Sequence, residues 1–292
     1  MAFLALSFLI GGLGIIFRLL GVHLEPLFGT LLFGAAVMGA AYILSVACEV
    51  SQLDIPRSLS IALIAILAVL PEYAVDFYFA WTAAHEPAHA AYAAANMTGA
   101  NRLLIGFGWA LVAVLYWFKA RRSVDLHMGY MMEIKYLLLA TLYSFLIPIK
   151  GRIDLLDAAV LVGLFVLYMR EAYRAPVEEP ELVGVSARIG AWPKGPRRFF
   201  VVLSFLFAGA AILASTEPFA ESLVALGKSW GIDEFLLVQW LAPLASESPE
   251  IIVATVFALR GNPVEGLGAL ISSKVNQWTL LVGTLPVVYS VS

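Results

Sequence analysis

Charge is the scarcest feature of this 292-residue sequence. Lysine, arginine, aspartate and glutamate make up only 13% of it, whereas hydrophobic residues make up 61%. A soluble domain carries about 25% charged residues, because charge covers its surface. The mean hydropathy is +0.89, and the apolar runs are long enough for a bilayer, which takes about 20 residues as helix. These properties exclude a soluble globular protein.

Cysteine and basic tracts are scarce as well. Cys48 is the single cysteine, so the chain forms no internal disulfide, and a small buried hydrophobic residue is its simplest interpretation. No run of lysine or arginine interleaved with aromatic residues predicts binding to nucleic acid. The sequence also indicates no cofactor and no protein partner, which leaves the lipid bilayer as the expected environment.

The apolar runs predict an all-α polytopic membrane protein with about nine transmembrane helices. Their expected limits are 2–20, 28–48, 58–83, 100–118, 133–149, 154–170, 198–215, 233–259 and 265–289. Residues 1–20 are interpreted as an extra membrane helix and not as a signal peptide, because no positive charge precedes the apolar run. A tight turn, "KGRID", joins the fifth and sixth spans.

The polar, proline-rich stretch 171–197 predicts an extended cytoplasmic loop. It divides a first membrane half, 28–170, from a second half, 198–292. Cytoplasmic loops are enriched in lysine and arginine, so their placement predicts a cytoplasmic N-terminus. The loops on that side hold Arg57, Lys119, Arg121, Arg122, Arg170, Arg174, Arg188, Lys194, Arg197, Arg198 and Arg260, and the opposite loops hold Arg18, Lys150, Arg152 and Lys228.

Ionisable residues inside the predicted spans are functional candidates, because charge at membrane depth is costly. Glu72 and Asp76 follow Pro71 on one helix face. Two further carboxylates, Glu247 and Glu250, flank a second proline. Proline removes a backbone hydrogen bond and is expected to break each helix. Broken helices with freed carbonyls beside carboxylates are typical of ion sites in transporters.

The two acidic helices belong to an internal repeat. Pro71-Glu72 in "AVLPEYAVD" aligns with Pro249-Glu250 in "SESPEIIVA". The next spans also match, with Gly99-Ala100-Asn101 on Ser272-Ser273-Lys274. On the predicted topology, the repeat at 58–118 and the repeat at 233–289 cross the membrane in opposite directions. The sequence therefore predicts inverted-topology repeats, an architecture of many secondary transporters.

These motifs resemble the two α-repeats of the calcium/cation antiporter superfamily, which includes the sodium/calcium exchangers. "AVLPE" (68–72) and "ASESPE" (245–250) resemble the first part of the family pattern, and "ANMTGAN" (95–101) and "GALISSK" (268–274) resemble the second. The resemblance implies central ion-binding carboxylates at Glu72 and Glu250, which would hold a metal cation. It also implies side-chain oxygen ligands, with the ion-binding set extended to Asn101, Glu247, Asp76, Ser246 and Ser273.

Several positions depart from the family pattern. Ala68 and Val69 replace two hydroxyl residues, and Glu247 replaces another. Lys274 stands where the family has Asn or Asp, and as an ammonium it offers only donors. We therefore interpret Lys274 and Arg102 as residues that compensate the charge of the carboxylates. We hypothesise that Lys274 pairs with Glu247 or Glu250 and stands in for one bound cation.

The resemblance implies a secondary active cation antiporter that exchanges Na+, Ca2+ and/or H+ by alternating access, not an enzyme. The expected location is a bacterial inner membrane. One alternative is a degenerate family member with a regulatory or scaffold role. The other is an intramembrane metallo-hydrolase, because His85, Glu86 and His89 match H-E-x-x-H. Pro87 disfavours it, since proline would break the helix that must hold both histidines.

Replacing Lys274 by asparagine restores the residue type of the family pattern. We expect Lys274→Asn to change ion selectivity or stoichiometry, because it removes a charge that could replace a cation. Transport in reconstituted vesicles measures this, and unchanged selectivity and stoichiometry would contradict the hypothesis.

Overall fold

The structure of the chain is a computed structural model. It describes residues 1–292 except 23, 86–98, 126–129, 178, 179, 181 and 232–246. The described part is all-helical. Its elements are α1 (Ala2–Leu19), α2 (Pro26–Ser51), α3 (Arg57–Ala83), the π-helical η1 (Arg102–Gly108), α5 (Trp109–Ala120), α6 (Met131–Ser144), α7 (Leu146–Lys150), α8 (Leu155–Arg174), α9 (Gly184–Gly190), α10 (Lys194–Ser229), α13 (Ser248–Arg260), α14 (Pro263–Asn276), the π-helical η4 (Gln277–Leu281) and α15 (Val282–Val291).

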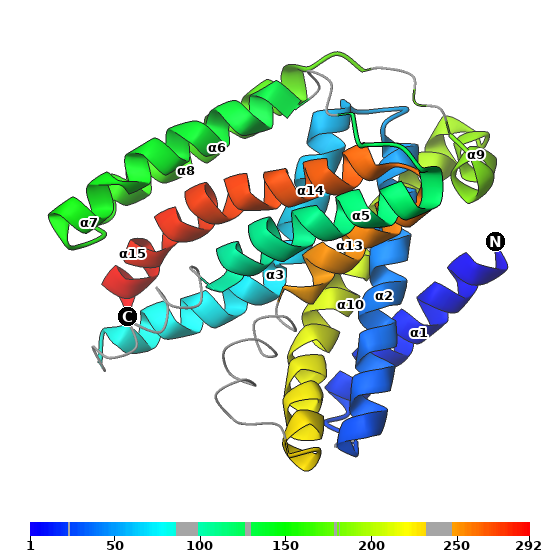
Figure 1. Ribbon diagram of the computed structural model, residues 1–292, viewed down its shortest axis with the longest axis horizontal. Helices are drawn as coiled ribbons and strands as arrows, with labels where there is room; N and C mark the ends of the chain where they lie inside the picture. The colour runs from blue at the N-terminus through cyan, green and yellow to red at the C-terminus, as the bar shows by residue number, and fades with distance from the viewer. Residues whose placement is uncertain (23, 86–98, 126–129, 178–179, 181, 232–246) are drawn as a thin grey trace.

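The helices form one bundle in which α3, α13 and α14 lie between two outer groups (Figure 1). One outer group contains α1, α2 and α10, and the other is the hairpin of α6, α7 and α8. The main apolar core lies where α2 and α10 meet each other and α13. Glycine allows α1 to approach α2 closely, because a Cβ on Gly14 would lie only 2.7 Å from Ala36 Cβ.

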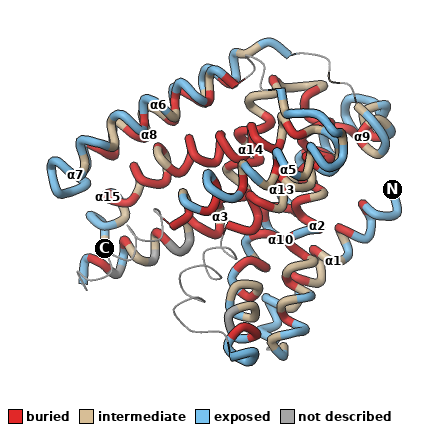
Figure 2. Tube along the Cα trace, in the orientation of Figure 1, coloured by how far each residue is buried: buried red, intermediate tan, exposed pale blue. Residues whose placement is uncertain are grey.

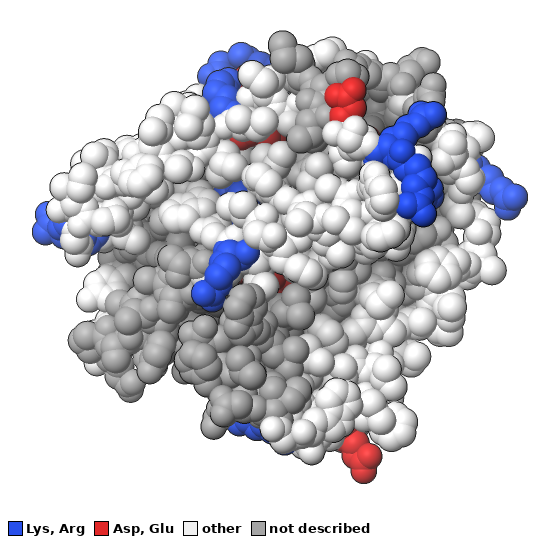
Figure 3. Space-filling view, in the orientation of Figure 1, with Lys and Arg blue, Asp and Glu red and all other residues white. Residues whose placement is uncertain are grey.

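Five helices of the described part are long and apolar enough to cross a membrane: Ala2–Leu19, Pro26–Ser51, Gly99–Ala120, Met131–Lys150 and Lys194–Ser229. Burial concentrates in the middle of the bundle, whereas α1 and the α6–α8 hairpin are exposed along much of their length (Figure 2). Their exposed side chains include Phe3, Leu9, Leu138 and Phe145. Uncharged residues also dominate the described surface in Figure 3. Apolar surface of this extent fits contact with lipid.

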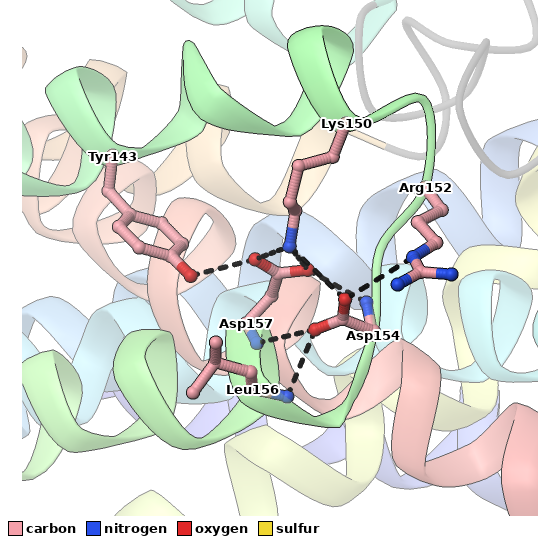
Figure 4. A network of polar contacts seen from close by, with 6 residues as sticks. All are labelled: Tyr143, Lys150, Arg152, Asp154, Leu156 and Asp157. Carbon is pink, nitrogen blue, oxygen red and sulfur yellow. Dashed lines mark hydrogen bonds and ion pairs between the residues drawn. The ribbon is translucent and has the colours of Figure 1, made fainter.

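The turn between α7 and α8 confirms the predicted tight connection at "KGRID". Asp154 caps α8, because its Oδ1 accepts from the backbone N–H groups of Leu156 (3.1 Å) and Asp157 (3.3 Å). Lys150 Nζ lies 2.6 Å from Asp157 Oδ1, which also accepts from the Tyr143 hydroxyl at 2.7 Å (Figure 4). Gly151 turns the chain at φ +67°. These ion pairs and hydrogen bonds hold α7 and the end of α6 to the start of α8.

Two features differ from the sequence expectations. Helix α3 runs without a break through Pro71, although proline was expected to interrupt it. The proline still deprives the Leu67 carbonyl of its usual donor, but packing on both sides keeps the helix continuous. The loop predicted at 171–197 is shortened from both ends, since α8 extends to Arg174 and α10 begins at Lys194. It also contains the short helix α9.

Helix α9 is fastened to the bundle at the end that holds the N-terminus (Figure 1). The Ser186 hydroxyl donates to Glu49 Oε2 at 2.5 Å, and Arg260 Nη2 donates to the same oxygen at 2.7 Å. Asn262 Nδ2 donates to Glu49 Oε1 at 2.9 Å. Helices α2, α9 and α13 therefore meet at one buried carboxylate, whose hydrogen bonds offset the cost of its burial.

Asp54 forms a second anchor between α2 and α3. Its Oδ2 accepts from Arg197 Nη2 at 2.9 Å, and its Oδ1 accepts from Arg198 Nε at 2.9 Å. Burial by itself would raise the pKa of Asp54, but the hydrogen bonds from Arg198 and Arg197 outweigh that effect and lower it. The ionised carboxylate therefore holds the start of α10 to the α2–α3 connection.

Asp54→Asn should lower the free energy of unfolding by about 2 kcal/mol at pH 7, because it weakens hydrogen bonds to two charged groups. A lowered folded-state pKa stabilises the fold above the ordinary aspartate pKa of about 3.9, and this contribution disappears as the pH falls through the folded-state value. The Tm difference between the wild type and the variant should therefore shrink on acidification. Glu221→Gln, at an exposed acid of α10, is the control, and a Tm difference independent of pH would contradict the prediction.

Candidate ion-binding site

Three buried carboxylates converge in the middle of the bundle. One oxygen from each of Glu72, Glu247 and Glu250 lies within 4.8 Å of the others. Their exposed fractions are 2%, 1% and 3%. Among the described residues, Glu72 Oε1, Glu247 Oε2 and Glu250 Oε2 accept no hydrogen bond. Oxygens of this kind are the ligands that hard cations prefer.

The start of α13 places two of these carboxylates. The helix begins at Ser248, with Pro249 in its first turn, where the missing N–H of proline removes no helical hydrogen bond. Glu247 occupies the N-cap position and Glu250 lies in the first turn. The positive end of the helix dipole favours negative charge there. Pro249 therefore lies in the first turn of α13, whereas Pro71 lies in the interior of α3.

A buried lysine reaches the cluster through an amide side chain. Lys274 is completely buried on α14, and its Nζ donates to Gln277 Oε1. Gln277 Nε2 in turn donates to Glu72 Oε2. The chain from ammonium to carboxylate therefore passes through Gln277, and the predicted pairing of Lys274 with Glu247 or Glu250 stays a prediction. Sequence reasoning missed Gln277, although its position three residues after Lys274 places both on one helix face.

Two further side-chain bonds cross the site, one between α3 and α14 and the other between η4 and the start of η1. The Tyr73 hydroxyl donates to Asn276 Oδ1 at 2.7 Å, and Trp278 Nε1 donates to Asn101 Oδ1 at 3.0 Å. Asn101 immediately precedes the π-helix η1, and Asn276 immediately precedes the π-helix η4. Such π-helical turns are rare and frequently occur at functional sites.

The structure brings together only part of the predicted set. Asp76 is buried one turn beyond Glu72 on α3, and Ser273 is buried beside Lys274. Asn101 is half-buried and bonded to Trp278. Arg102 is exposed, and its charge-compensating role stays a prediction. Ser246 lies outside the described residues.

The alternative zinc motif is only partly described. His85 is exposed at the end of α3, and Glu86 and His89 lie outside the described residues. Trp81 and Trp117 are 49% and 47% exposed, as expected of aromatic residues at a membrane interface. Within the described residues, the acidic cluster of Glu72, Glu247 and Glu250 is the one group with the geometry for a metal ion.

Charge balance defines what the cluster can do. Three ionised carboxylates in a buried site require compensating positive charge, because their mutual repulsion is weakly screened there. Lys274 supplies one positive charge. The remaining charge can be balanced by a metal cation, by protons, or by both in turn. A site of this kind can therefore take up different cations alternately.

These features define a class, an integral membrane protein with a buried carboxylate site between its helices. The sequence profile described as "Sodium/calcium exchanger protein" matches residues 25–172 and 200–292. The chain therefore belongs to the sodium/calcium exchanger family, within the calcium/cation antiporter superfamily. No curated protein matches the sequence significantly.

Solved structures agree with this assignment. The crystal structure of the H+/Ca2+ exchanger CAX is 48% identical, with a TM-score of 0.79 over 99% of this chain and 73% of that chain. The sodium-calcium exchanger NCX_Mj, soaked with 10 mM Na+ and zero Ca2+, is 17% identical, with a TM-score of 0.63 over 99% of this chain and 87% of that one. The second similarity shows the shared fold alone. Both proteins are exchangers, which agrees with a protein that is not an enzyme.

Removing the Gln277 amide should destabilise the protein. Gln277→Leu leaves the Lys274 ammonium and the Glu72 carboxylate each without a buried hydrogen bond, which costs about 2 kcal/mol or more. Gln52→Leu is the matched control, because within the described part of the chain this buried glutamine donates to Cys48 Sγ alone, at 3.8 Å. Thermal unfolding in detergent should show a larger loss of Tm for Gln277→Leu, and equal losses would show that the amide bridge is energetically unimportant.

Proposed function

We propose that the protein is a secondary active cation antiporter whose exchange site is the cluster of Glu72, Glu247 and Glu250. The single observation that carries this proposal is the convergence of three buried carboxylate oxygens that accept no hydrogen bond within the described residues. Glu72 and Glu250 are the central cation ligands. Asp76, Asn101, Ser246 and Ser273 complete the proposed ion-binding set.

The proposed substrates are Ca2+ and H+, with Na+ as a further candidate. The exchanger CAX, which is 48% identical, is described as exchanging H+ and Ca2+. Three carboxylates can bind either a divalent cation or protons, and both forms relieve their repulsion. The Lys274 ammonium, reaching Glu72 through Gln277, is a proposed internal charge that replaces part of a cation when the site is empty.

The proposed mechanism is alternating access between two inverted repeats, 58–118 and 233–289, within about nine membrane spans. The π-helices support this pairing. The sequence repeat aligns Asn101 with Lys274. On that alignment the π-helix η1, residues 102–108, corresponds to residues 275–281, which contain the second π-helix, η4. The directions of the two acidic helices, α3 and α13, also support it. Arg57, at the start of α3, lies 3.1 Å from Glu265, which follows the end of α13. The start of α3 therefore lies near the end of α13, as expected for helices that run in opposite directions.

The proposed orientation has a cytoplasmic N-terminus in a bacterial inner membrane. The helix ends and connections assigned to the N-terminal side, including the α9 segment, contain eleven of the fifteen lysine and arginine residues assigned to the two sides. We also propose that this segment divides the membrane part into halves at 28–170 and 198–292. Glu72 lies about 22 Å along α3 from Arg57, which places the cluster near the middle of a membrane.

A regulatory or scaffold role for a degenerate member is the second candidate. It is motivated by Lys274, which occupies a position that the family resemblance assigns to an oxygen ligand. A transport assay on the wild-type protein separates the two functions, because a scaffold does not require flux.

Neutralising the central carboxylates should abolish exchange. We expect Glu72→Gln and Glu250→Gln each to reduce Ca2+/H+ exchange in proteoliposomes about 100-fold or more, since each removes a charge that binds the cation during the transport cycle. Flux is measured with a calcium dye and an internal pH dye, and with Na+ in place of H+. Glu221→Gln is the control for loss of an acid elsewhere. Full exchange by either central variant, or no wild-type flux with any cation, would overturn the proposal.

A further inference from the structure

Glu133 is a buried carboxylate outside the central cluster. It lies in the first turn of α6, near the N-terminal side of the bundle, and its exposed fraction is 0%. Neither Oε1 nor Oε2 accepts a hydrogen bond of ordinary geometry from the described residues. An ionised carboxylate buried in this way costs several kcal/mol. An unsatisfied buried group of this kind requires a physical explanation.

Neighbouring acids on the same side of the bundle all have basic partners. Glu49 pairs with Arg260, Asp54 with Arg197, and Glu265 with Arg57. Glu171 pairs with Lys135 at 2.5 Å. Glu133 differs from these acids because it has no such partner among the described residues.

The cations near Glu133 are already engaged elsewhere. Arg57 Nη2 donates to the Tyr130 hydroxyl at 2.8 Å and lies 3.1 Å from Glu265 Oε1. The titratable and charged groups around the carboxylate are Arg57 on α3, Tyr168 and Glu171 on α8, Glu265 on α14, Tyr130 at the N-cap of α6, and Lys135 on α6. Arg57 Nε has no hydrogen-bond partner within the described residues, but no described basic side chain forms an ion pair with Glu133, so a small bound ligand can neutralise it.

The surroundings favour a proton over a metal ion as that ligand. Calcium takes six to eight oxygen ligands. Among the described residues, Glu133 belongs to no group of three or more side chains that could hold a metal ion. A proton needs only the carboxylate itself, and it removes the cost of burying the charge.

A pair of hydroxyl groups connects this region with the central site. Tyr168 is 1% exposed, and its hydroxyl lies 2.8 Å from Ser272 Oγ in a hydrogen bond that either group can donate. The Tyr168 ring lies 5.6 Å from the ring of Tyr136, which is one helical turn after Glu133 on α6. Ser272 is buried on α14, two residues before Lys274. The pair thus joins α8, beside Glu133, to the helix that carries the buried lysine.

We propose that Glu133 is a second proton-binding carboxylate, which exchanges its proton with the central site through Tyr168 and Ser272. In each transfer the Glu133 carboxyl releases one proton toward the Tyr168 oxygen. Tyr168 passes its own hydroxyl proton to Ser272, and Ser272 passes its own to a basic group of the central site. One proton leaves Glu133, one arrives at the site, and both hydroxyls are restored. The role in exchange rests on the proposed proton-coupled function.

The first test detects the proton without requiring transport. Infrared difference spectra of the purified protein across a pH titration should contain a C=O band from the protonated Glu133 carboxyl, and this band should be lost in Glu133→Gln. The matched control is Glu171→Gln, an acid on the same side with 45% of its side chain exposed. That variant should keep the band. A titration without a band that depends on Glu133 would overturn the proposal.

The second test measures exchange in proteoliposomes. Glu133→Gln should slow Ca2+/H+ exchange roughly 100-fold, the lower end of what a positioned proton-transfer group contributes, and leave Ca2+ binding in detergent unchanged. Tyr168→Phe should keep the infrared band but slow exchange. Normal exchange by both variants would overturn the route. A wild-type protein that exchanges no cation would instead overturn the proposed function, and the infrared comparison would still decide whether Glu133 binds a proton.

Discussion

The charge balance of the buried cluster is the constraint on which the rest of the structure depends. Glu72, Glu247 and Glu250 lie too close together, and too far from water, to remain ionised without compensation. Lys274 supplies part of it from a position where it is itself fully buried. Gln277 joins the ammonium to Glu72, so α3, α14 and η4 form one polar unit.

The outer parts of the bundle hold the helices that carry this unit. Helix α13 has Glu250 at its beginning and Arg260 at its end, about 15 Å away along the helix. Arg260 binds Glu49 on α2, which also binds Ser186 on α9. The position of the cluster is therefore connected to α9, in the segment between α8 and α10. Rigid anchors of this kind suit a site whose carboxylates repel one another when no cation is bound.

Several features followed from local sequence. Hydropathy predicted the membrane class and the positions of most helices, because a helix in lipid must be apolar over its whole length. Pro249 and Glu250 were identified from a repeated motif, and the structure places Glu250 in the cluster with Glu72. The break at Pro71 was wrong, since a local propensity yields to the packing of a helix on both sides.

The sequence by itself determined that the protein spans a membrane, that acids lie within its helices, and that two segments resemble one exchanger pattern. These are properties of composition, spacing and local motif. The tertiary structure decided which groups meet: Gln277 with Glu72, Trp278 with Asn101, and Tyr168 with Ser272. It also left Glu133 buried without a basic partner within the described part. These contacts join residues far apart in the chain, so they depend on how whole helices pack and on the side chains that meet between them.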